Sequence, residues 1–348
     1  MNIKSLLLGS AAALVAVSGA HAADAVVVAE PEPAEYVRIC DVYGAGYFYI
    51  PGTETCLRVG GYVRFDASAG DGGRVKDGRA VADARTGRIQ DTWKTNTRFA
   101  LRTWTGQETE LGTLKTYTET RFNYGDGASS ASLNFAWVQL GGLRIGKDES
   151  AYDSFSGYAG SVLQDTIIPY GLKDTNLISY YFDGGNGFTA MASLEQGSGV
   201  DTIDSYAPHV VLGAKYKQGA FGLTGVAAYN SVWEEWAGKI RLDIKASKDL
   251  SLFLMGGYGT DDHAATSFYK PWAGNFAVWG GGSYAINEKT AFNAQLSYTD
   301  AKDFAVAANV AFAVVPGFTV TPEINYYENF DRSNSDAIGG IIRFQRSF

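Results

Sequence analysis

Residues 239–245 read Lys-Ile-Arg-Leu-Asp-Ile-Lys, so charged and apolar side chains alternate through the whole stretch. Successive side chains of a β-strand point to opposite faces, which gives this stretch one apolar face and one charged face. A helix with the same sequence would distribute its charges around the entire circumference. The stretch therefore predicts a strand that separates an apolar environment from water.

The same two-residue period recurs along the chain and predicts sixteen strands. They are expected near residues 57–67, 94–105, 112–124, 132–141, 142–147, 174–183, 187–196, 209–217, 220–230, 235–246, 250–259, 275–285, 290–299, 303–313, 317–327 and 337–348. Short turns, such as Gly141-Gly142, alternate with longer connections, such as 69–93 and 260–274. An even number of strands with this alternation is typical of bacterial outer-membrane barrels. We therefore predict an all-β, 16-stranded antiparallel transmembrane β-barrel over residues 57–348.

A secreted β-sandwich is the alternative fold. Sixteen strands would have to form two packed sheets, and the polar faces of several strands carry more than one Arg or Lys. Closure into a barrel removes every open sheet edge, which a membrane requires. The sequence favours the barrel.

The amino-terminal residues 1–22 have the pattern of a cleaved secretory signal peptide. Lys4 precedes an apolar run, and Ala20-His21-Ala22 forms a small-residue cleavage site, so the mature chain is expected to begin at Ala23. The apolar run from Leu6 to Val17 is shorter than the roughly 20 residues that a membrane-spanning helix needs.

The charge of the chain argues against nucleic acid as a partner. The full sequence has 29 Lys and Arg against 37 Asp and Glu, and loss of Lys4 with the signal peptide leaves 28 against 37, or −9. Nucleic-acid binding depends on clustered cations that neutralise phosphates.

The two cysteines, Cys40 and Cys56, are expected to form a disulfide, because an even pair at close spacing in an exported chain is typical of one. A bridge across a loop of this size contributes about 3 kcal/mol in the chain-entropy model. A metal site is the weaker alternative, since no His lies nearby. Residues 23–56 are expected to form an amino-terminal segment on the periplasmic side of the barrel.

Residues 148–173 form a long connection in an otherwise regular array of strands. This connection is acidic at its start and rich in Ser, Gly and Tyr. Loops of this length without structure of their own are usually functional. A gate or filter inside the barrel is the interpretation we adopt.

Enzymatic interpretations find little support. His209 and His263 have no nucleophile motif beside them, and the Gly pairs do not form a phosphate-binding loop. Asp261-Asp262 binds a divalent ion weakly or is only loop charge, and no His/Cys metal spacing occurs. We expect no catalysis, no cofactor and no metal.

Five stretches resemble the alphaproteobacterial outer-membrane porins. They are Tyr43-Gly-Ala-Gly-Tyr-Phe-Tyr-Ile-Pro-Gly-Thr-Glu-Thr-Cys-Leu-Arg, Leu111-Gly-Thr-Leu-Lys-Thr-Tyr-Thr-Glu, Val138-Gln-Leu-Gly-Gly-Leu-Arg-Ile-Gly, Val315-Pro-Gly-Phe-Thr-Val-Thr-Pro-Glu and Arg343-Phe-Gln-Arg-Ser-Phe. The resemblance implies a homotrimer in the outer membrane of a Gram-negative bacterium, in contact with lipid and lipopolysaccharide, that passes small hydrophilic solutes. It also implies that the loop after the fifth strand, residues 148–173, folds into the lumen. The terminal Phe348 resembles the signal that the barrel-assembly machinery reads, although Arg346 departs from its apolar alternation.

Alternation places a set of cations on the water-facing side of neighbouring strands. This predicted basic wall consists of Arg58, Arg64, Arg98, Arg102, Lys115, Arg121, Arg144 and Arg343. The predicted acids of the loop are Asp148, Glu149, Asp153 and Asp165. Opposite charges across a narrow waist create a transverse field that sets selectivity in pores. A solvated strand face with an acidic surface loop is the alternative interpretation.

These features predict a general diffusion porin. Two alternatives remain: a channel selective for one solute class, such as sugars or anions, and a plugged barrel that acts as an adhesin or an enzyme.

Overall fold

The computed structural model of the protein describes residues 37–71, 77–171, 173–260, 262 and 267–348. The chain divides into two units, Met1–Arg38 and Ile39–Phe348, and every strand belongs to the second. The predicted signal peptide (residues 1–22), the expected start at Ala23, Asp261 and His263 lie outside the described residues.

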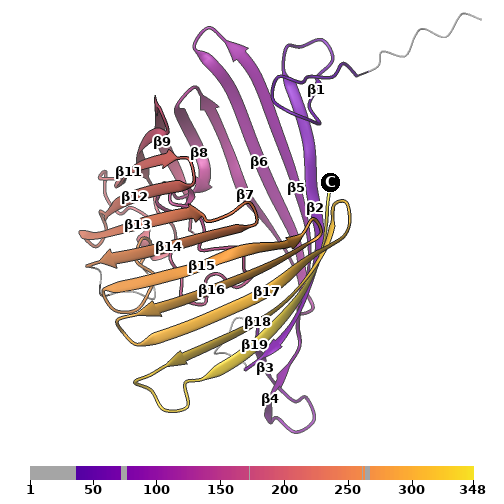
Figure 1. The fold of residues 1–348 in the computed structure, drawn as a ribbon, viewed down its shortest axis with the longest axis vertical. Helices are drawn as coiled ribbons and strands as arrows, with labels where there is room; N and C mark the ends of the chain where they lie inside the picture. The colour runs from indigo at the N-terminus through magenta and orange to yellow at the C-terminus, as the bar shows by residue number, and fades with distance from the viewer. Residues whose placement is uncertain (1–36, 72–76, 172, 261, 263–266) are drawn as a thin grey trace, which may run out of the picture. The chain divides into compact units, whose positions relative to one another are not determined.

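The second unit is a closed antiparallel β-barrel (Figure 1). Sixteen strands of the described chain form the wall: β2 (Cys56–Gly70), β5 (Lys94–Thr109), β6 (Gly112–Gly125), β7 (Ala128–Leu140), β8 (Leu143–Glu149), β9 (Asp174–Gly185), β10 (Phe188–Glu195), β11 (His209–Gln218), β12 (Phe221–Asn230), β13 (Glu235–Lys245), β14 (Leu250–Gly259), β15 (Phe276–Asn287), β16 (Thr290–Thr299), β17 (Asp303–Val315), β18 (Phe318–Asn329) and β19 (Ala337–Ser347). Each strand pairs with its neighbour in the chain, and β19 pairs with β2 to close the ring. The predicted fold is confirmed.

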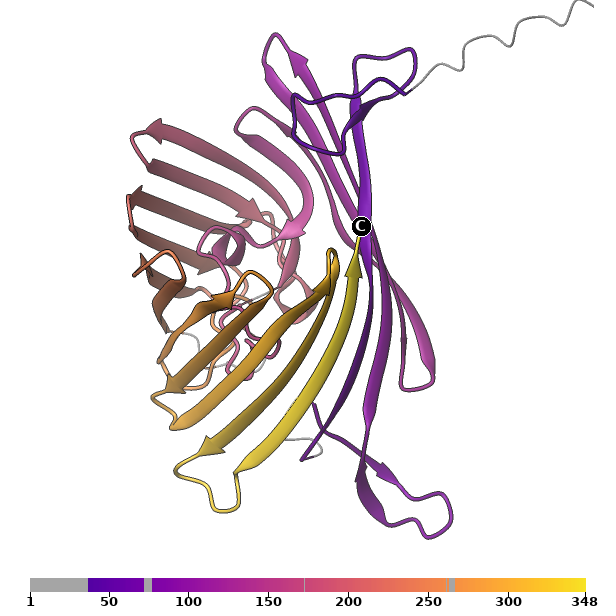
Figure 2. The same ribbon diagram turned by 45° about the vertical axis from the view of Figure 1, so that its right-hand side comes forward.

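The connections differ in length at the two ends of the barrel. Tight turns join β7 to β8 and β13 to β14. Long segments follow β8, β10 and β14 (Figure 2). The segment after β2, predicted as a long connection over residues 69–93, contains a hairpin of β3 (Arg79–Ala82) and β4 (Ile89–Thr92). Four residues are too few for alternation to distinguish a strand from a loop. In the described part of the chain, no helix is long and apolar enough to cross a bilayer.

The two faces of the wall differ in polarity as the alternation predicts. On β13 the Lys239 side chain is 2% exposed on the inner face, while its neighbour Ile240 is 65% exposed on the outer face. Aromatic side chains such as Trp236 and Tyr258 also lie exposed on the outer surface. Water-exposed apolar area on this scale is costly for a soluble protein, so the outer face suits a bilayer.

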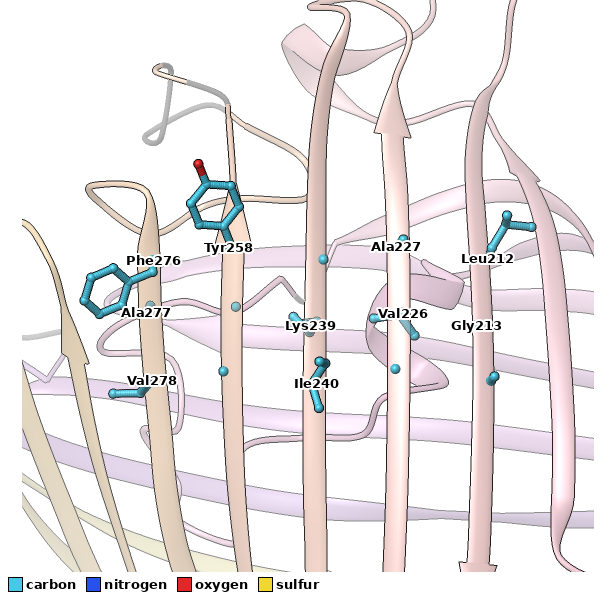
Figure 3. Close-up of a pocket in the computed structure, with 15 residues that line it drawn as sticks. Leu212, Gly213, Val226, Ala227, Lys239, Ile240, Tyr258, Phe276, Ala277 and Val278 are labelled. Carbon is cyan, nitrogen blue, oxygen red and sulfur yellow. The ribbon is translucent and has the colours of Figure 1, made fainter.

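Small residues leave a shallow apolar groove on the outer face of β11–β15. The groove has a volume of about 860 Å³ (Figure 3). Gly225 and Gly256 lie in its floor, and a Cβ atom added at either one would contact nothing within 4 Å. Ile240 and Tyr258 rise beside these glycines. The groove is therefore part of the outward apolar surface and does not open into the lumen.

Cys40 and Cys56 form the predicted disulfide, with 6.0 Å between their Cα atoms. The bridge holds the segment before β2 against the wall, where β1 (Phe48–Tyr49) pairs with β2. The Tyr43 ring lies over Gly106, where a Cβ atom would overlap the ring, and the Tyr43 hydroxyl donates to Glu108 at 2.9 Å.

We expect the Cys40→Ser/Cys56→Ser variant to assemble poorly, because the free segment no longer covers the start of β2. The free energy of unfolding should fall by about 3 kcal/mol, the loop-closure contribution of the bridge. Heat-modified gel mobility and thermal melting of the oligomer measure this. Oligomer yield and melting temperature equal to those of the wild-type protein would contradict it.

Candidate pore constriction

All eight predicted wall cations lie on strands whose register directs them to the inner face. β2 and β5 pair so that Arg64 lies directly opposite Arg98, and Arg58 lies opposite Trp104. Arg343 on β19 lies opposite Asp66 on β2, so closure of the barrel adds it to the same group. We call this set the arginine wall: Arg58, Arg64, Arg98, Arg102, Lys115, Arg121, Arg144 and Arg343.

Three carboxylates within the arginine wall neutralise part of its charge. Glu119, whose side chain is fully buried, accepts from Arg102 at 2.5 Å and also from Arg121. Asp66 accepts two hydrogen bonds from Arg343, at 2.7 and 3.0 Å. Asp148 pairs with Arg144 at 2.7 Å. Eight cations and three carboxylates leave a net charge of +5.

Aromatic rings hold several of these guanidinium groups flat against the barrel. Arg64 and Arg102 lie over the Tyr62 ring, at 5.0 and 5.1 Å from its centroid. Arg144 lies 4.0 Å from the centroid of the Trp137 ring, on a neighbouring strand. Cation–π contacts of this kind are worth about 0.5–2 kcal/mol and restrict the rotamers of long side chains. The cations are therefore held in fixed positions on the wall.

The connection between β8 and β9 runs inside the barrel, where a buried ion pair fixes its first turn (Figures 1 and 2). α2 (Ala151–Ser154) begins at Ser150, whose hydroxyl accepts from the Tyr152 backbone N–H. Within α2, Asp153 is 1% exposed and pairs with Lys239 at 2.6 Å. Gly171 packs on the same carboxylate at a φ of +138°, and a Cβ atom there would overlap it.

The rest of the connection is fastened to β13–β18 by side chains that reach its backbone. Lys239 donates to the Tyr170 carbonyl at 2.9 Å, and Trp279 donates to the Ile168 carbonyl at 2.9 Å. Glu323 accepts from the backbone N–H groups of Leu163 and Gln164. Further donors to loop carbonyls are Arg241, Gln295 and Asn309. Within the described part of the chain, these anchors hold the connection along one side of the lumen, away from β5 and β6.

The four predicted loop acids occupy different environments. Asp148 and Glu149 end β8 and are 5% and 7% exposed, and Glu149 accepts from the Tyr158 hydroxyl at 2.7 Å. Asp153 is buried against Lys239. Asp165 is half-buried and accepts from the Tyr170 hydroxyl at 2.5 Å.

Two ionisable groups outside the wall strands are perturbed by this packing. Burial and then the Glu149 carboxylate raise the pKa of the Tyr158 hydroxyl, which donates to that carboxylate. Burial raises the pKa of Asp77, which accepts hydrogen bonds from Gln164 and Asn325. We call residues 150–171 of the connection between β8 and β9 the inner loop, and Asp77 thereby links the segment after β2 to it.

Sequence reasoning did not single out several residues that build this site. Lys239 and Arg241 lie in the stretch that predicted the strand, and Glu323 belongs to a stretch that carried the resemblance. Asp66 and Glu119 have the same parity as the wall cations. Alternation could have placed all five on the inner face, but only the register reveals their partners.

The chain matches the family model described as "Porin subfamily" over residues 24–343. It is 51% identical to porin Omp2b of Brucella canis over 376 aligned positions, covering all of both chains. It has the same identity and coverage with porin Omp2b of Brucella abortus.

Solved structures with the same fold include an outer membrane channel, DcaP of Acinetobacter baumannii, at a TM-score of 0.65 and 15% identity. That match covers 86% of this chain and 99% of the other. A triple mutant of the Rhodopseudomonas blastica porin matches at a TM-score of 0.55 and 15% identity, covering 84% and 100%.

Lys239→Met should release the inner loop, because removal of one partner leaves the Asp153 charge buried. Breaking such a pair costs about 3–5 kcal/mol, so protection of residues 150–171 against proteolysis should fall by roughly two to four orders of magnitude. The barrel itself should melt nearly unchanged, since the loop can move away to hydrate its charge.

The matched control is Lys239→Met/Asp153→Leu, which removes both charges and should recover most of the protection. Equal cleavage rates in the wild-type protein and the single variant would show that the ion pair does not hold the loop.

Proposed function

The chain belongs to the porin family and forms an outer-membrane channel of a Gram-negative bacterium, and from this premise we propose how the lumen selects its solutes. Small hydrophilic solutes and ions pass down their gradients between the arginine wall and the inner loop. The family is one of channels rather than enzymes, and it suggests a trimeric assembly. We extend the trimer to this chain, with outer-membrane lipid and lipopolysaccharide around it and Phe348 as its assembly signal.

The observation that carries this proposal is the position of eight cations on the inner face of β19, β2, β5, β6 and β8, within an arc of six consecutive strands that also includes β7, while the loop is anchored along other strands. Charges within one Debye length of a permeating ion, roughly 8–10 Å in physiological solutions, act on it with little screening. The net charge of +5 makes the arginine wall favour anions.

We assign different roles to the four loop acids. Asp148 and Glu149 lie where the loop leaves the wall, and they offset the charge of Arg144 at the edge of the opening. Asp165 contributes negative charge along the loop, opposite the wall. Asp153 acts indirectly, since its pairing with Lys239 fixes the loop in place.

A sugar-selective channel is the second candidate, favoured by a row of aromatic rings across β5, β6 and β7. Trp104, Tyr117 and Trp137 lie directly opposite one another on the inner face, with ring centroids 5.4 and 5.7 Å apart. Arg58 and Arg144 already lie over the two tryptophan rings, so a sugar would have to displace them. This competition favours ions and charged solutes over sugars.

Single-channel recording in a planar bilayer under a salt gradient tests the constriction. We expect Arg98→Ala/Arg102→Ala to lower the anion preference and Asp148→Asn/Glu149→Gln to raise it, each changing the permeability ratio on the order of twofold. Current steps should occur in groups of three if the channel is a trimer.

The control variant is Lys248→Gln, because the Lys248 side chain is 90% exposed on a tight turn. It should leave the permeability ratio unchanged. Conductance and preference unaltered in both double variants would place the constriction elsewhere, and a folded barrel without any conductance would return the plugged-barrel interpretation.

A further inference from the structure

A second group of cations lies on the inner face of the barrel, away from the arginine wall. A recess of about 610 Å³ lies between the inner loop and β11–β13, near the end of the barrel that carries the tight turns. Its cations are Lys215, Lys217, Arg241 and Lys245, and its single carboxylate is Asp243. We call it the lysine recess, and its net charge is +3.

Only one of these four cations is neutralised. Arg241 donates to both oxygens of Asp243, at 2.8–3.0 Å, and also to the Tyr158 carbonyl of the loop. Among the described residues, no carboxylate lies within 4 Å of the ammonium groups of Lys215, Lys217 or Lys245. Asp243 is already engaged, so three ammonium groups remain available to a solute.

The geometry of the recess suits an anion larger than chloride. Lys215 and Lys217 follow each other on one face of β11, about 7 Å apart along the strand. Lys215 lies 4.7 Å from the centroid of the Phe155 ring, which partly removes its ammonium group from water. Thr224, directly opposite Lys215, adds a hydroxyl group to the lining. Gly222, opposite Lys217, adds no side chain to the recess, and a Cβ atom there would lie 3.7 Å from the Asp243 Cβ atom.

We propose that the lysine recess binds small phosphorylated anions as they cross the channel, which rests on the proposed function. Ammonium groups are common phosphate ligands because they act as point charges with several donors. Two or three of them at this spacing favour a dianion over a monovalent ion. The recess lies beside Tyr158 and α2. An anion that has passed the arginine wall therefore meets a second positively charged site on the other side of the loop.

Inorganic phosphate is the probe that tests this inference. Chloride current through single channels is recorded while phosphate is added at constant ionic strength. In the wild-type protein, phosphate should reduce the current with a saturable dependence. In Lys215→Gln/Lys217→Gln the half-blocking concentration should rise on the order of tenfold, whereas in Lys248→Gln it should stay at the wild-type value.

A non-saturable effect in the wild-type protein would overturn the inference, as would an unchanged half-blocking concentration in the double variant with normal oligomer yield. An equal rise in Lys248→Gln would do the same, since it would indicate long-range charge rather than a site. None of these results touches the proposed function, which is tested separately by the current of the wild-type barrel and by the arginine-wall and loop-acid variants.

Discussion

Every other feature of this molecule depends on the closure of one hydrogen-bonded sheet. The ladder between β19 and β2 runs from Gly339 opposite Gly70 to Ser347 opposite Tyr62. Beyond it, Gly61 and Phe348 exchange backbone hydrogen bonds at 3.0 and 3.1 Å. A bilayer offers no water to an unpaired N–H or C=O group, so an open edge would cost several kcal/mol for each group. Residues 339–348 thus complete the wall.

Because the sheet is closed, the alternation of side chains places apolar residues on the outer face of the barrel and charged residues on the inner face. All charge carried by the strands within the membrane must face inward, and the inner face therefore collects cations and carboxylates close together. Like charges such as Arg64 and Arg98, directly opposite each other, are tolerated because Asp66 and the Tyr62 ring lie beside them. The crowded inner wall carries the selectivity that we propose.

The inner loop is anchored to the barrel wall by a buried ion pair. The Lys239–Asp153 pair is dry, and a dry pair contributes little net stability because both charges lose their hydration. Its value is geometric, since it fixes where α2 sits against the wall. With the loop held along β13–β18, the arginine wall and the lysine recess lie on different sides of it, and both remain accessible to solutes.

Local periodicity was enough to predict much of this molecule. Alternation placed Arg98, Arg102 and Arg121 on the correct face, and the spacing of Cys40 and Cys56 predicted their bridge. The loop acids illustrate the limit, because residues 148–173 have no period from which the direction of Asp153 or Asp165 could be read.

The sequence by itself determined the strands, their faces and the disulfide, because these depend on neighbours a few residues apart in the chain. Only the tertiary structure decided that Asp153 meets Lys239, 86 residues away, and that Glu119 lies between two arginines. Such partners depend on barrel closure and on the register between strands, and no local pattern encodes either one.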